Sequence, residues 1–317
     1  MQQTTPQELP IPLLRKIRYG IEAAAAYTLY GFFKLLPVNA ASATGGFIGR
    51  MIGPHLGASK KAYENLALAF PDKTDAEKKD LIRKMWDNMG RTIAEYPHLV
   101  ALGKKAELVG GDILETIAQS DAPAILVAAH LGNWEVGLAS VRQQRGFEAY
   151  LTYRRLNNPL VDRLLSRARE SGAEGQIHKK RSAAIEMMRL VKDKKTLAIM
   201  IDQKLNEGIA VPFFGHDAMT IPFPAQLALK HDCPLYPARI ERIKGTAFRV
   251  TVYPALEVKK TGDTDQDIRQ LLQDMNHMLE GWIHERPEQW LWLHRRWPRE
   301  ITAAKKNILP DGENLSA

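Results

Sequence analysis

Apolar and polar positions change their spacing near residue 124. Before it, apolar side chains recur every three or four residues, most regularly after a capping box formed by Thr74 and Glu77, which predicts amphipathic helices. From Ala124–Ala129 onward, short apolar runs alternate with stretches of helical spacing. This alternation predicts an α/β protein in which a central, mostly parallel sheet is covered by helices.

The predicted strands are apolar runs bounded by polar or turn-forming residues, and each predicted helix carries one apolar face. We predict strands over 124–129, 147–153, 196–201, 235–243 and 247–258. We predict helices over 62–70, 113–118, 182–191, 224–231 and 264–284, one after Thr74, and one that begins at Pro159 behind an Asn158 cap. Val211–Gly215 is predicted to be a loop.

The N-terminal segment Tyr19–Pro37 is mostly apolar but carries two charges, Glu22 and Lys34. Its uncharged stretch, Ala23–Phe33, has 11 residues, whereas a bilayer span needs about 20. A spanning helix would require both charged side chains to reach opposite interfaces. A helix lying in the interface and a buried soluble helix explain the same residues. We expect a membrane-associated helix and leave its mode of attachment open.

The chain is basic, with a formal charge of +8 and a pI near 9.4 over 317 residues. This charge favours an anionic partner, which can be nucleic acid, a phosphate-bearing lipid surface or an acidic carrier protein. The sequence holds no RNP, helix-turn-helix or zinc pattern, so we do not expect it to bind nucleic acid. The single cysteine, Cys233, excludes an internal disulfide framework and is predicted to be a buried thiol.

Polar residues follow the predicted strand at 124–129 at once, and they include His130 and Glu135. In open α/β sheets, reactive groups collect where strand carboxyl ends meet helix amino ends. His130 in the turn is a candidate general base, and Glu135 in the first helical turn is a candidate for the carboxylate that orients it. A surface histidine, with Glu135 interacting with the helix dipole, explains the same residue types. The residue types alone leave both interpretations open.

Metal binding and covalent catalysis are not expected from the sequence. The His-x4-Glu spacing differs from the zinc-binding helix motif, and no Cys/His cluster accompanies it. There is no Gly-x-Ser-x-Gly elbow, and Cys233 lies in an unrelated turn. We therefore expect a substrate hydroxyl to attack directly, without a nucleophilic side chain of the protein.

Basic residues at Arg154-Arg155, Lys179–Arg181 and Lys204 offer phosphate contacts, although such runs are more often solvated surface.

Six blocks of residues occur in an order that is typical of one family. They are Asn65-Leu66 through Phe70-Pro71, His130–Glu135, Tyr153-Arg154 with Asn158-Pro159, Asp202-Gln203, Val211–Gly215 with Ala218 and Thr220, and Gln289–Trp297. With these blocks, from about residue 15 to 300, the chain resembles the late acyltransferases of lipid A biosynthesis (lauroyl and myristoyl acyltransferases). These belong to the wider lysophospholipid acyltransferase superfamily.

The resemblance implies an O-acyltransferase without a cofactor and without an acyl-enzyme. A fatty acyl chain would pass from an acyl thioester, on acyl carrier protein or CoA, to a hydroxyl of a lipid A precursor. His130 would be the general base, and Glu135 would orient it. Backbone N–H groups near Gly132 and Asn133 are candidate oxyanion donors. The substrate-binding residues that the resemblance implies are Gly132, Asn133, Arg154, Asn158, Asp202, Gln203, Phe214, Gly215 and Thr220.

The implied partners are acyl carrier protein or acyl-CoA, a phosphorylated glycolipid acceptor and a membrane surface. The implied location is the inner membrane, with the catalytic domain on the cytoplasmic face. The sequence departs from the commoner pattern at Arg155, where a proline is usual, and at Lys204, where an acidic residue often stands. Both changes add positive charge. The expected organisation is a tail and membrane-anchoring helix over 1–40, an acyltransferase catalytic domain over 41–300 and a flexible tail over 301–317.

Three alternatives remain open at this point. The acceptor can instead be a lysophospholipid or another glycolipid. The same His130–Glu135 pair can activate water, which would make the protein a thioesterase. The chain can also be a non-catalytic lipid- or nucleic-acid-binding protein. The acyl chain length and the acylated hydroxyl are not readable from the sequence.

Overall fold

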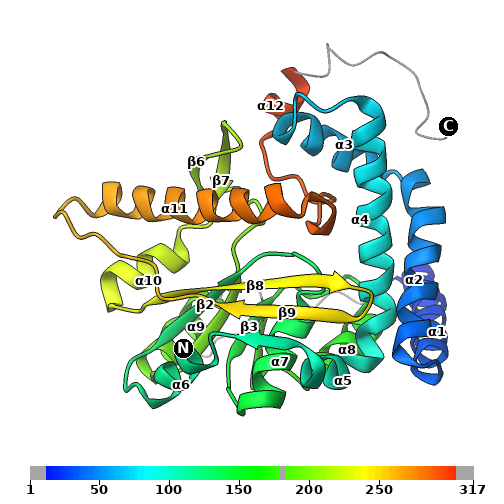
Figure 1. Ribbon diagram of the computed structural model, residues 1–317, viewed down its shortest axis with the longest axis horizontal. Helices are drawn as coiled ribbons and strands as arrows, with labels where there is room; N and C mark the ends of the chain where they lie inside the picture. Colours follow the sequence, from blue (N-terminus) through cyan, green and yellow to red (C-terminus); the bar gives the residue numbers. More distant parts are fainter. Residues whose placement is uncertain (1–11, 179–182, 305–317) are drawn as a thin grey trace.

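The computed structural model describes residues 12–178 and 183–304, so nearly all of the two predicted tails and the Lys179–Arg181 run lie outside the described residues. The described chain forms a seven-stranded sheet of order β1-β9-β8-β2-β5-β3-β4, in which only β8 and β9 pair antiparallel (Figure 1). Its strands are β1 (Glu107–Val109), β2 (Ala124–Ala128), β3 (Tyr150–Tyr153), β4 (Gly175–His178), β5 (Thr196–Met200), β8 (Leu235–Lys244) and β9 (Ala247–Val252). The predicted α/β class with a mostly parallel central sheet is confirmed.

Helices cover both faces of this sheet. Those of the N-terminal part are α1 (Leu13–Leu35), α2 (Val38–Ile52), α3 (Ala58–Ala69), α4 (Asp75–Glu95) and α5 (Leu99–Lys105), with short 3-10 turns η1 (Gly53–His55) and η2 (Tyr96–His98). The others are α6 (Gly111–Gln119), α7 (Glu135–Arg145), α8 (Pro159–Arg169), α9 (Ala183–Lys192), α10 (Phe223–His231), α11 (Thr264–Glu285), η3 (Pro287–Gln289) and α12 (Arg299–Ala304).

The central strand β2 shows why the sheet is covered on both sides. Ile125 and Val127 pack into the core cluster that includes residues of α3, α4, α9, α10 and α11. Leu126, between them, packs into a separate cluster with residues of α6 and α7 on the opposite face. A strand buried on both faces must be apolar at every position, which explains the uninterrupted run of the sequence. Figure 1 shows α5–α8 on one side of the sheet, and α10 and α11 on the other.

Helix α4 begins and packs as its sequence predicts. Thr74 accepts a hydrogen bond from the Glu77 N–H, and the Glu77 carboxylate accepts one from the Thr74 N–H, so the capping box is confirmed. Where α4 crosses α2, a Cβ added to Gly45 would lie 2.4 Å from the Gly90 carbonyl oxygen. The two backbones can approach this closely only because glycines stand at the crossing.

The prediction of a loop at Val211–Gly215 is wrong. Strand β6 (Ile209–Phe213) pairs antiparallel with β7 (His216–Thr220) in a separate two-stranded sheet. Phe214 and Gly215 form the two-residue turn, with φ values of 49° and 71°. Positive φ at both turn positions is typical of tight hairpins, but a phenylalanine is an unusual residue at the first of them. The strands β1 and β4 were not predicted, and β9 ends at Val252, before the predicted end at 258.

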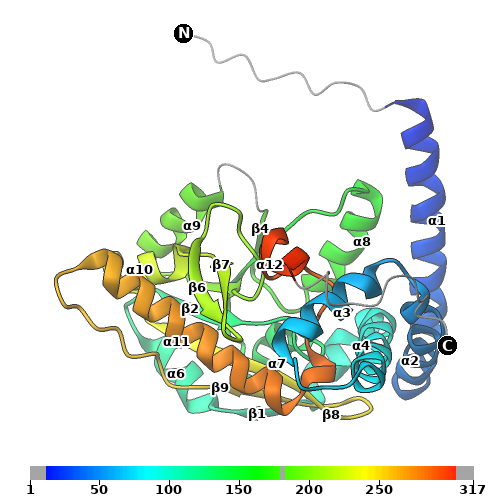
Figure 2. The same ribbon diagram turned by 90° about the horizontal axis from the view of Figure 1, so that it is seen from above.

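Helix α1 runs along one side of the molecule next to α8 (Figure 2). Several of its large apolar side chains are exposed, including Leu13 (73%) and Leu14 (82%), whereas only Ala23 and Phe33 of this helix are buried. Within residues 12–178 and 183–304, no helix combines the length and apolar character needed to cross a bilayer. Cys233 is fully buried, as predicted, and burial raises the pKa of its thiol to about 12.

Candidate active site

Two neighbouring strands bring His130 and Asp202 together. Strands β2 and β5 run parallel with Ala128 opposite Met200. His130 lies two residues after Ala128, and Asp202 lies two residues after Met200. The His130 Nδ1 lies 2.8 Å from Asp202 Oδ1, and the His130 backbone N–H donates to Asp202 Oδ2 at 2.9 Å. The carboxyl ends of the two strands therefore carry a hydrogen-bonded His–Asp pair, in the position where α/β proteins bind ligands.

Asp202 is buried and ionised. Burial on its own would raise the pKa of Asp202, but the charge of His130 and the hydrogen bonds from His130 and Trp290 outweigh it and hold the pKa far below its usual range. An ionised carboxylate only accepts hydrogen bonds, so His130 Nδ1 is the donor. In the neutral imidazole the opposite nitrogen, Nε2, then carries the lone pair, and it lies 3.5 Å from the side-chain nitrogen of Gln203.

Glu135 does not pair with His130, so this prediction is wrong. Its carboxylate accepts hydrogen bonds from Arg169 at 2.7 Å, from the Tyr96 hydroxyl at 2.5 Å and from the Trp134 indole N–H at 3.1 Å. The physical reason is local. Helix α7 begins at Glu135 itself, and its side chain points toward Arg169 of α8 and Tyr96 of η2 instead of toward the turn that holds His130.

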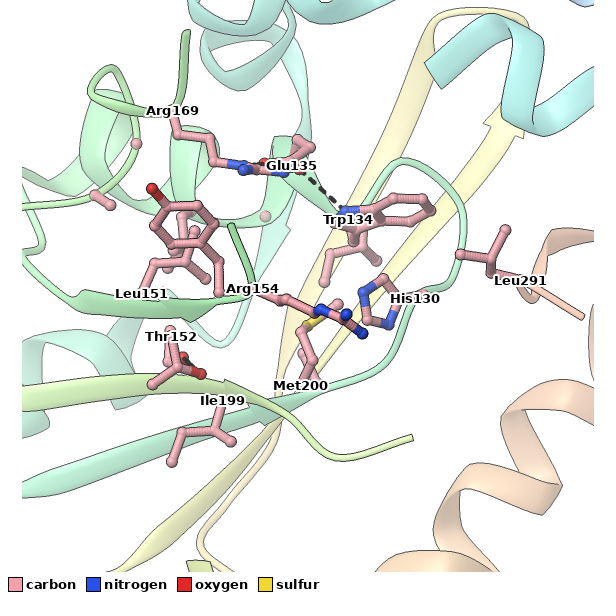
Figure 3. Close-up of a pocket in the computed structure, with 18 of the residues that line it drawn as sticks. His130, Trp134, Glu135, Leu151, Thr152, Arg154, Arg169, Ile199, Met200 and Leu291 are labelled. Carbon is pink, nitrogen blue, oxygen red and sulfur yellow. Dashed lines mark hydrogen bonds and ion pairs between the residues drawn. The ribbon is translucent and has the colours of Figure 1, made fainter. Parts of the chain in front are cut away.

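The Glu135 cluster still touches His130, through one intermediate residue. The Trp134 ring meets the His130 ring edge-on, with centroids 4.9 Å apart, while its indole N–H is bonded to Glu135 (Figure 3). Burial opposes the charge of Glu135, but Arg169 and the hydrogen bonds of the cluster hold its pKa below the usual range. Burial and the neighbouring Glu135 raise the pKa of Tyr96 well above 10, so Tyr96 is a neutral donor.

The turn after His130 is fixed by a segment near the end of the described chain. The Gly132 N–H donates to the Gln289 carbonyl at 3.1 Å, and the Leu291 N–H donates to the His130 carbonyl at 3.1 Å. Gly132 has φ +57°, and a Cβ there would lie 2.9 Å from the carbonyl oxygen of Ile240 on β8. Only glycine fits this turn without strain. Because its N–H is already bonded, Gly132 is not the predicted oxyanion donor.

Asn133 is also occupied within the protein. Its side-chain nitrogen donates to Glu95 at 2.8 Å, and its side-chain oxygen accepts the Glu135 N–H at 3.2 Å. Glu95 in turn forms a buried ion pair with Arg242 of β8 through both carboxylate oxygens, 2.5 and 2.9 Å from the guanidinium. Asn133 thus holds the turn to α4 and β8, and its side chain is not available to a substrate.

A cavity of about 680 Å³ opens beside His130. Its buried lining is mainly apolar, with Tyr96 and Glu135 as polar members, and the apolar residues come from α7 and the strands β2, β5 and β9: Leu126, Leu138, Val141, Ala198, Val250 and Val252, among others. Its outer part carries His130 and several cations. This volume falls in the range of about 300–1,000 Å³ that is typical of pockets for small ligands. The cavity can therefore take an apolar chain inside and a charged group at its opening.

Two of the predicted substrate-binding residues, Arg154 and Gln203, line this cavity. Arg154 follows β3, is exposed, and extends toward His130 in Figure 3. We call Arg154 and three further cavity-lining cations, Arg155, Lys204 and Arg295, the cationic rim. Contact of these side chains with a substrate stays a prediction. Arg154, Arg155 and Lys204 belong to the basic positions that the sequence offered for phosphate contacts. The place of Arg295 in the rim was not predicted.

Asn158 lies elsewhere, against α1. Its side-chain oxygen accepts the Leu160 N–H at 3.0 Å, which confirms the predicted cap of α8. Its side-chain nitrogen donates to the Tyr19 carbonyl and to Glu22 of α1, at 2.9 and 3.0 Å. The described residues that line the cavity include Asn157 but not Asn158. Asn158 therefore joins two helices, and its contact with a substrate stays a prediction.

The predicted binding residues of the β6–β7 hairpin are also not among the described residues that line the cavity. Phe214 and Gly215 make the hairpin turn, and the Phe214 ring packs on Phe70 and Trp297. The Thr220 hydroxyl accepts a hydrogen bond from the buried Arg296 at 2.9 Å. Phe214 and Thr220 thus hold the hairpin to the core, Gly215 forms its turn, and contact of these residues with a substrate stays a prediction.

Besides Arg295, the residues at the site that were not predicted include Tyr96, Trp134, Arg169 and Trp290. Trp134 and Trp290 lie in the sequence blocks typical of the family, but those blocks do not reveal their side-chain partners. Tyr96 and Arg169 stand in helical stretches without any motif, so no sequence signal marked them. Among the described residues, no group of three or more His, Cys, Asp or Glu side chains is placed to hold a metal ion.

Comparisons with known proteins agree on one family. The model of a family described as bacterial lipid A biosynthesis acyltransferase matches residues 12–299. The chain is 24% identical over 281 residues to a lipid A biosynthesis myristoyltransferase of Escherichia coli strain K12, covering 83% of each chain. It is 23% identical to a lipid A biosynthesis acyltransferase of Haemophilus influenzae (74% of this chain, 73% of the relative). It is also 22% identical to a phosphatidylinositol mannoside acyltransferase of Mycolicibacterium smegmatis (79% and 83%).

Proposed function

Because the chain belongs to the bacterial lipid A biosynthesis acyltransferase family and is an acyltransferase, we propose that it transfers a fatty acyl chain from an acyl thioester to a hydroxyl of a lipid A precursor. The observation that carries the mechanism is the His130–Asp202 pair at the opening of a cavity with an apolar interior. The names of the relatives support lipid A as the acceptor type.

His130 is the general base in this proposal. Its Nε2 removes the proton of the acceptor hydroxyl while the hydroxyl oxygen attacks the thioester carbonyl carbon. The tetrahedral intermediate collapses with cleavage of the C–S bond, and the imidazolium returns its proton to the leaving thiolate. Asp202 steadies the imidazolium and fixes its tautomer through Nδ1. Asp202 therefore takes the orienting role that the resemblance gave to Glu135, and no acyl-enzyme is needed.

The developing oxyanion needs donors other than the bonded Gly132 N–H. Gln203 and Arg154 line the cavity and are the candidate donors in this proposal. The Gln203 amide nitrogen lies 3.5 Å from His130 Nε2, and the Arg154 side chain extends toward His130 (Figure 3). An amide N–H or a guanidinium aimed at the intermediate stabilises charge that appears only in the transition state. In this proposal they take the place of the Gly132 N–H, and the Asn133 backbone N–H stays a predicted donor.

The two parts of the cavity suit the two ends of an amphiphilic substrate. The apolar space between α7 and the sheet takes the acyl chain, whose transfer from water is favourable by about 0.8 kcal/mol per buried methylene. The cationic rim takes the anionic groups of the partners, namely a phosphorylated glycolipid and either acyl carrier protein or acyl-CoA. No cofactor enters this scheme.

A second acceptor class has support of its own. The similarity to a phosphatidylinositol mannoside acyltransferase extends over 79% of this chain. The chemistry at His130 would be unchanged if the hydroxyl belonged to another glycolipid. A panel of acceptors separates the two candidates.

Attachment to a membrane surface is part of the proposal. Leu13, Leu14 and Ile17 of α1 and Phe47 and Met51 of α2 are exposed apolar side chains. Within α1, Arg15, Lys16 and Arg18 lie near the beginning and Lys34 lies in the last turn, which favours an anionic bilayer surface. Such a helix lies in the interface, with the catalytic domain on the cytoplasmic face of the inner membrane. Co-sedimentation with anionic liposomes, lost when Leu14 and Ile17 are replaced by Glu, tests this attachment.

His130→Ala tests the mechanism. We expect acyl transfer to a tetra-acylated lipid A precursor, read by mass spectrometry with a panel of acyl donors, to fall at least about a thousandfold. The matched control is His277→Ala, because His277 is an exposed histidine on α11. Acyl transfer at the wild-type rate in His130→Ala would contradict the mechanism. Release of free fatty acid without ester formation by the wild-type protein would point to a thioesterase instead.

A further inference from the structure

We infer that Trp290 is a positioning residue for the His130–Asp202 pair. Its indole N–H donates to Asp202 Oδ2 at 2.8 Å, on the oxygen that does not face the His130 ring. The inference rests on the proposed function, because it assigns Trp290 a role in orienting the general base. Trp290 is buried and is not among the described residues that line the cavity, so it acts through Asp202 and not on the substrate.

Three donors converge on the Asp202 carboxylate. Oδ2 accepts the His130 backbone N–H at 2.9 Å and the Trp290 indole N–H at 2.8 Å, and Oδ1 is left for His130 Nδ1. The terminal torsion of an aspartate is soft, so a carboxylate is oriented by its donors more than by its own rotamer. Without the indole donor, one backbone N–H alone would hold Oδ2.

The indole is itself held rigidly. The Trp290 ring packs edge-on against the rings of Trp292 and Phe213, with ring centroids 4.5 and 5.8 Å apart, respectively. Its backbone forms a β-bridge with Leu131, the residue after His130. The same short segment thus fixes the backbone of the His130 turn and the carboxylate that orients the His130 side chain.

The chain provides a matched control for this role. Trp292 is fully buried, lies two residues away, and also donates its indole N–H to a protein acceptor, the Pro287 carbonyl at 2.7 Å. Trp290→Phe and Trp292→Phe therefore remove the same atoms and one hydrogen bond each from one aromatic cluster. Only the first removes a donor from Asp202.

The first measurement is steady-state acyl transfer by the full chain, with thermal unfolding followed in parallel. We expect Trp290→Phe to lower kcat by about tenfold to a hundredfold with little change in KM, because hydrogen bonds to charged groups are the stronger ones. Trp292→Phe should shift the melting temperature by a similar amount and lower kcat less than about threefold. Equal loss of kcat in the two variants would overturn the inference.

Two further readouts separate positioning from a general loss of structure. In an Asp202→Asn background, Trp290→Phe should cost no further activity, whereas Trp292→Phe should cost what it costs in the wild type. In protein labelled with 15N-histidine, the His130 Nδ1–H resonance should move or broaden in Trp290→Phe and stay in place in Trp292→Phe. An additive loss in the Asp202→Asn background, or an unmoved resonance in Trp290→Phe, would contradict the inference.

The failure of this inference is distinguishable from failure of the proposed function. If the wild-type protein transfers no acyl chain to any acceptor, the proposed function fails, while the His130 resonance still reports whether Trp290 orients the pair. If the wild-type protein is active and the resonance does not respond to Trp290→Phe, only the role of Trp290 is overturned.

Discussion

Two buried carboxylates, Asp202 and Glu135, lie near His130, one in direct contact and one behind Trp134, and they differ in the partner that each one binds. Asp202 holds an imidazole, a backbone N–H and an indole. Glu135 holds the guanidinium of Arg169, with a phenol and another indole. Both carboxylates have depressed pKa values, so both are ionised at neutral pH.

The difference lies in what the partner can do. An imidazole gains and loses a proton near neutral pH, so a carboxylate bound to it can support proton transfer. The guanidinium of Arg169 stays charged. Burial alone would lower the pKa of Arg169, but the charge of Glu135 and the hydrogen bonds to Glu135 and Tyr96 outweigh burial and raise it. The Glu135–Arg169 pair is therefore a clamp between α7 and α8. Its contact with His130 passes through the packing of Trp134.

Asp202→Asn is the substitution with the largest expected effect on activity. An amide in place of the orienting carboxylate favours the wrong imidazole tautomer, which in catalytic triads lowers kcat by about four powers of ten. We expect a loss of about a thousandfold or more in kcat. The variant should remain folded, because an amide still accepts from the Trp290 indole. A matched control is Asp217→Asn on the exposed side of β7.

Activity close to that of the wild type in Asp202→Asn would break the comparison, since the two carboxylates would then be equally structural.

Glu135→Gln should act first on stability. Removing one partner of a buried ion pair leaves the other charge without compensation, which costs about 3–5 kcal/mol in the free energy of unfolding. Urea unfolding measures this loss. Replacing both partners, Glu135→Gln with Arg169→Met, should restore part of it, because no buried charge is then left unpaired.

If Glu135→Gln keeps wild-type stability but loses activity as fully as Asp202→Asn, Glu135 belongs to the chemistry and the contrast fails.

The sequence predicted the outline of this site but not its pairing. The apolar run at Ala124–Ala129 and the polar turn after it located His130 correctly. The partner could not be found, because Asp202 is 72 residues away in the chain and its position depends on β5 lying next to β2, an order that no local pattern encodes. Glu135 was preferred because it is near His130 in sequence, although α7 directs its side chain elsewhere.

The same reason limits the other predicted substrate contacts. Asn158 and Thr220 belong to blocks that mark the family, and family resemblance does not distinguish residues that bind substrate from residues that hold the fold. Each satisfies its polar groups within the protein, by capping α8 and by accepting from the buried Arg296. Burial and hydrogen-bond partners, which are three-dimensional facts, decide between the two roles. Periodicity sufficed for helices and central strands because their burial is repeated along the chain.

The smallest expected effect is a change in the pH dependence of stability, and it tests both carboxylates at once. Each has a folded-state pKa below its unfolded value, which is about 3.9 for Asp and 4.3 for Glu. The unfolded state therefore binds more protons as the pH falls below about 4.5, and stability is lost from there toward the folded-state pKa. Each site contributes a slope of up to about 1.4 kcal/mol per pH unit in this window.

Asp202→Asn and Glu135→Gln should each remove the contribution of one carboxylate to this slope, as measured by urea unfolding between pH 3 and 6, and the double variant should remove both contributions. His130→Ala removes a partner of Asp202 only, so it should reduce the contribution of Asp202 to the slope of stability against pH and leave the contribution of Glu135 unchanged. An unchanged slope in both carboxylate variants would mean that neither carboxylate is held ionised by its partners.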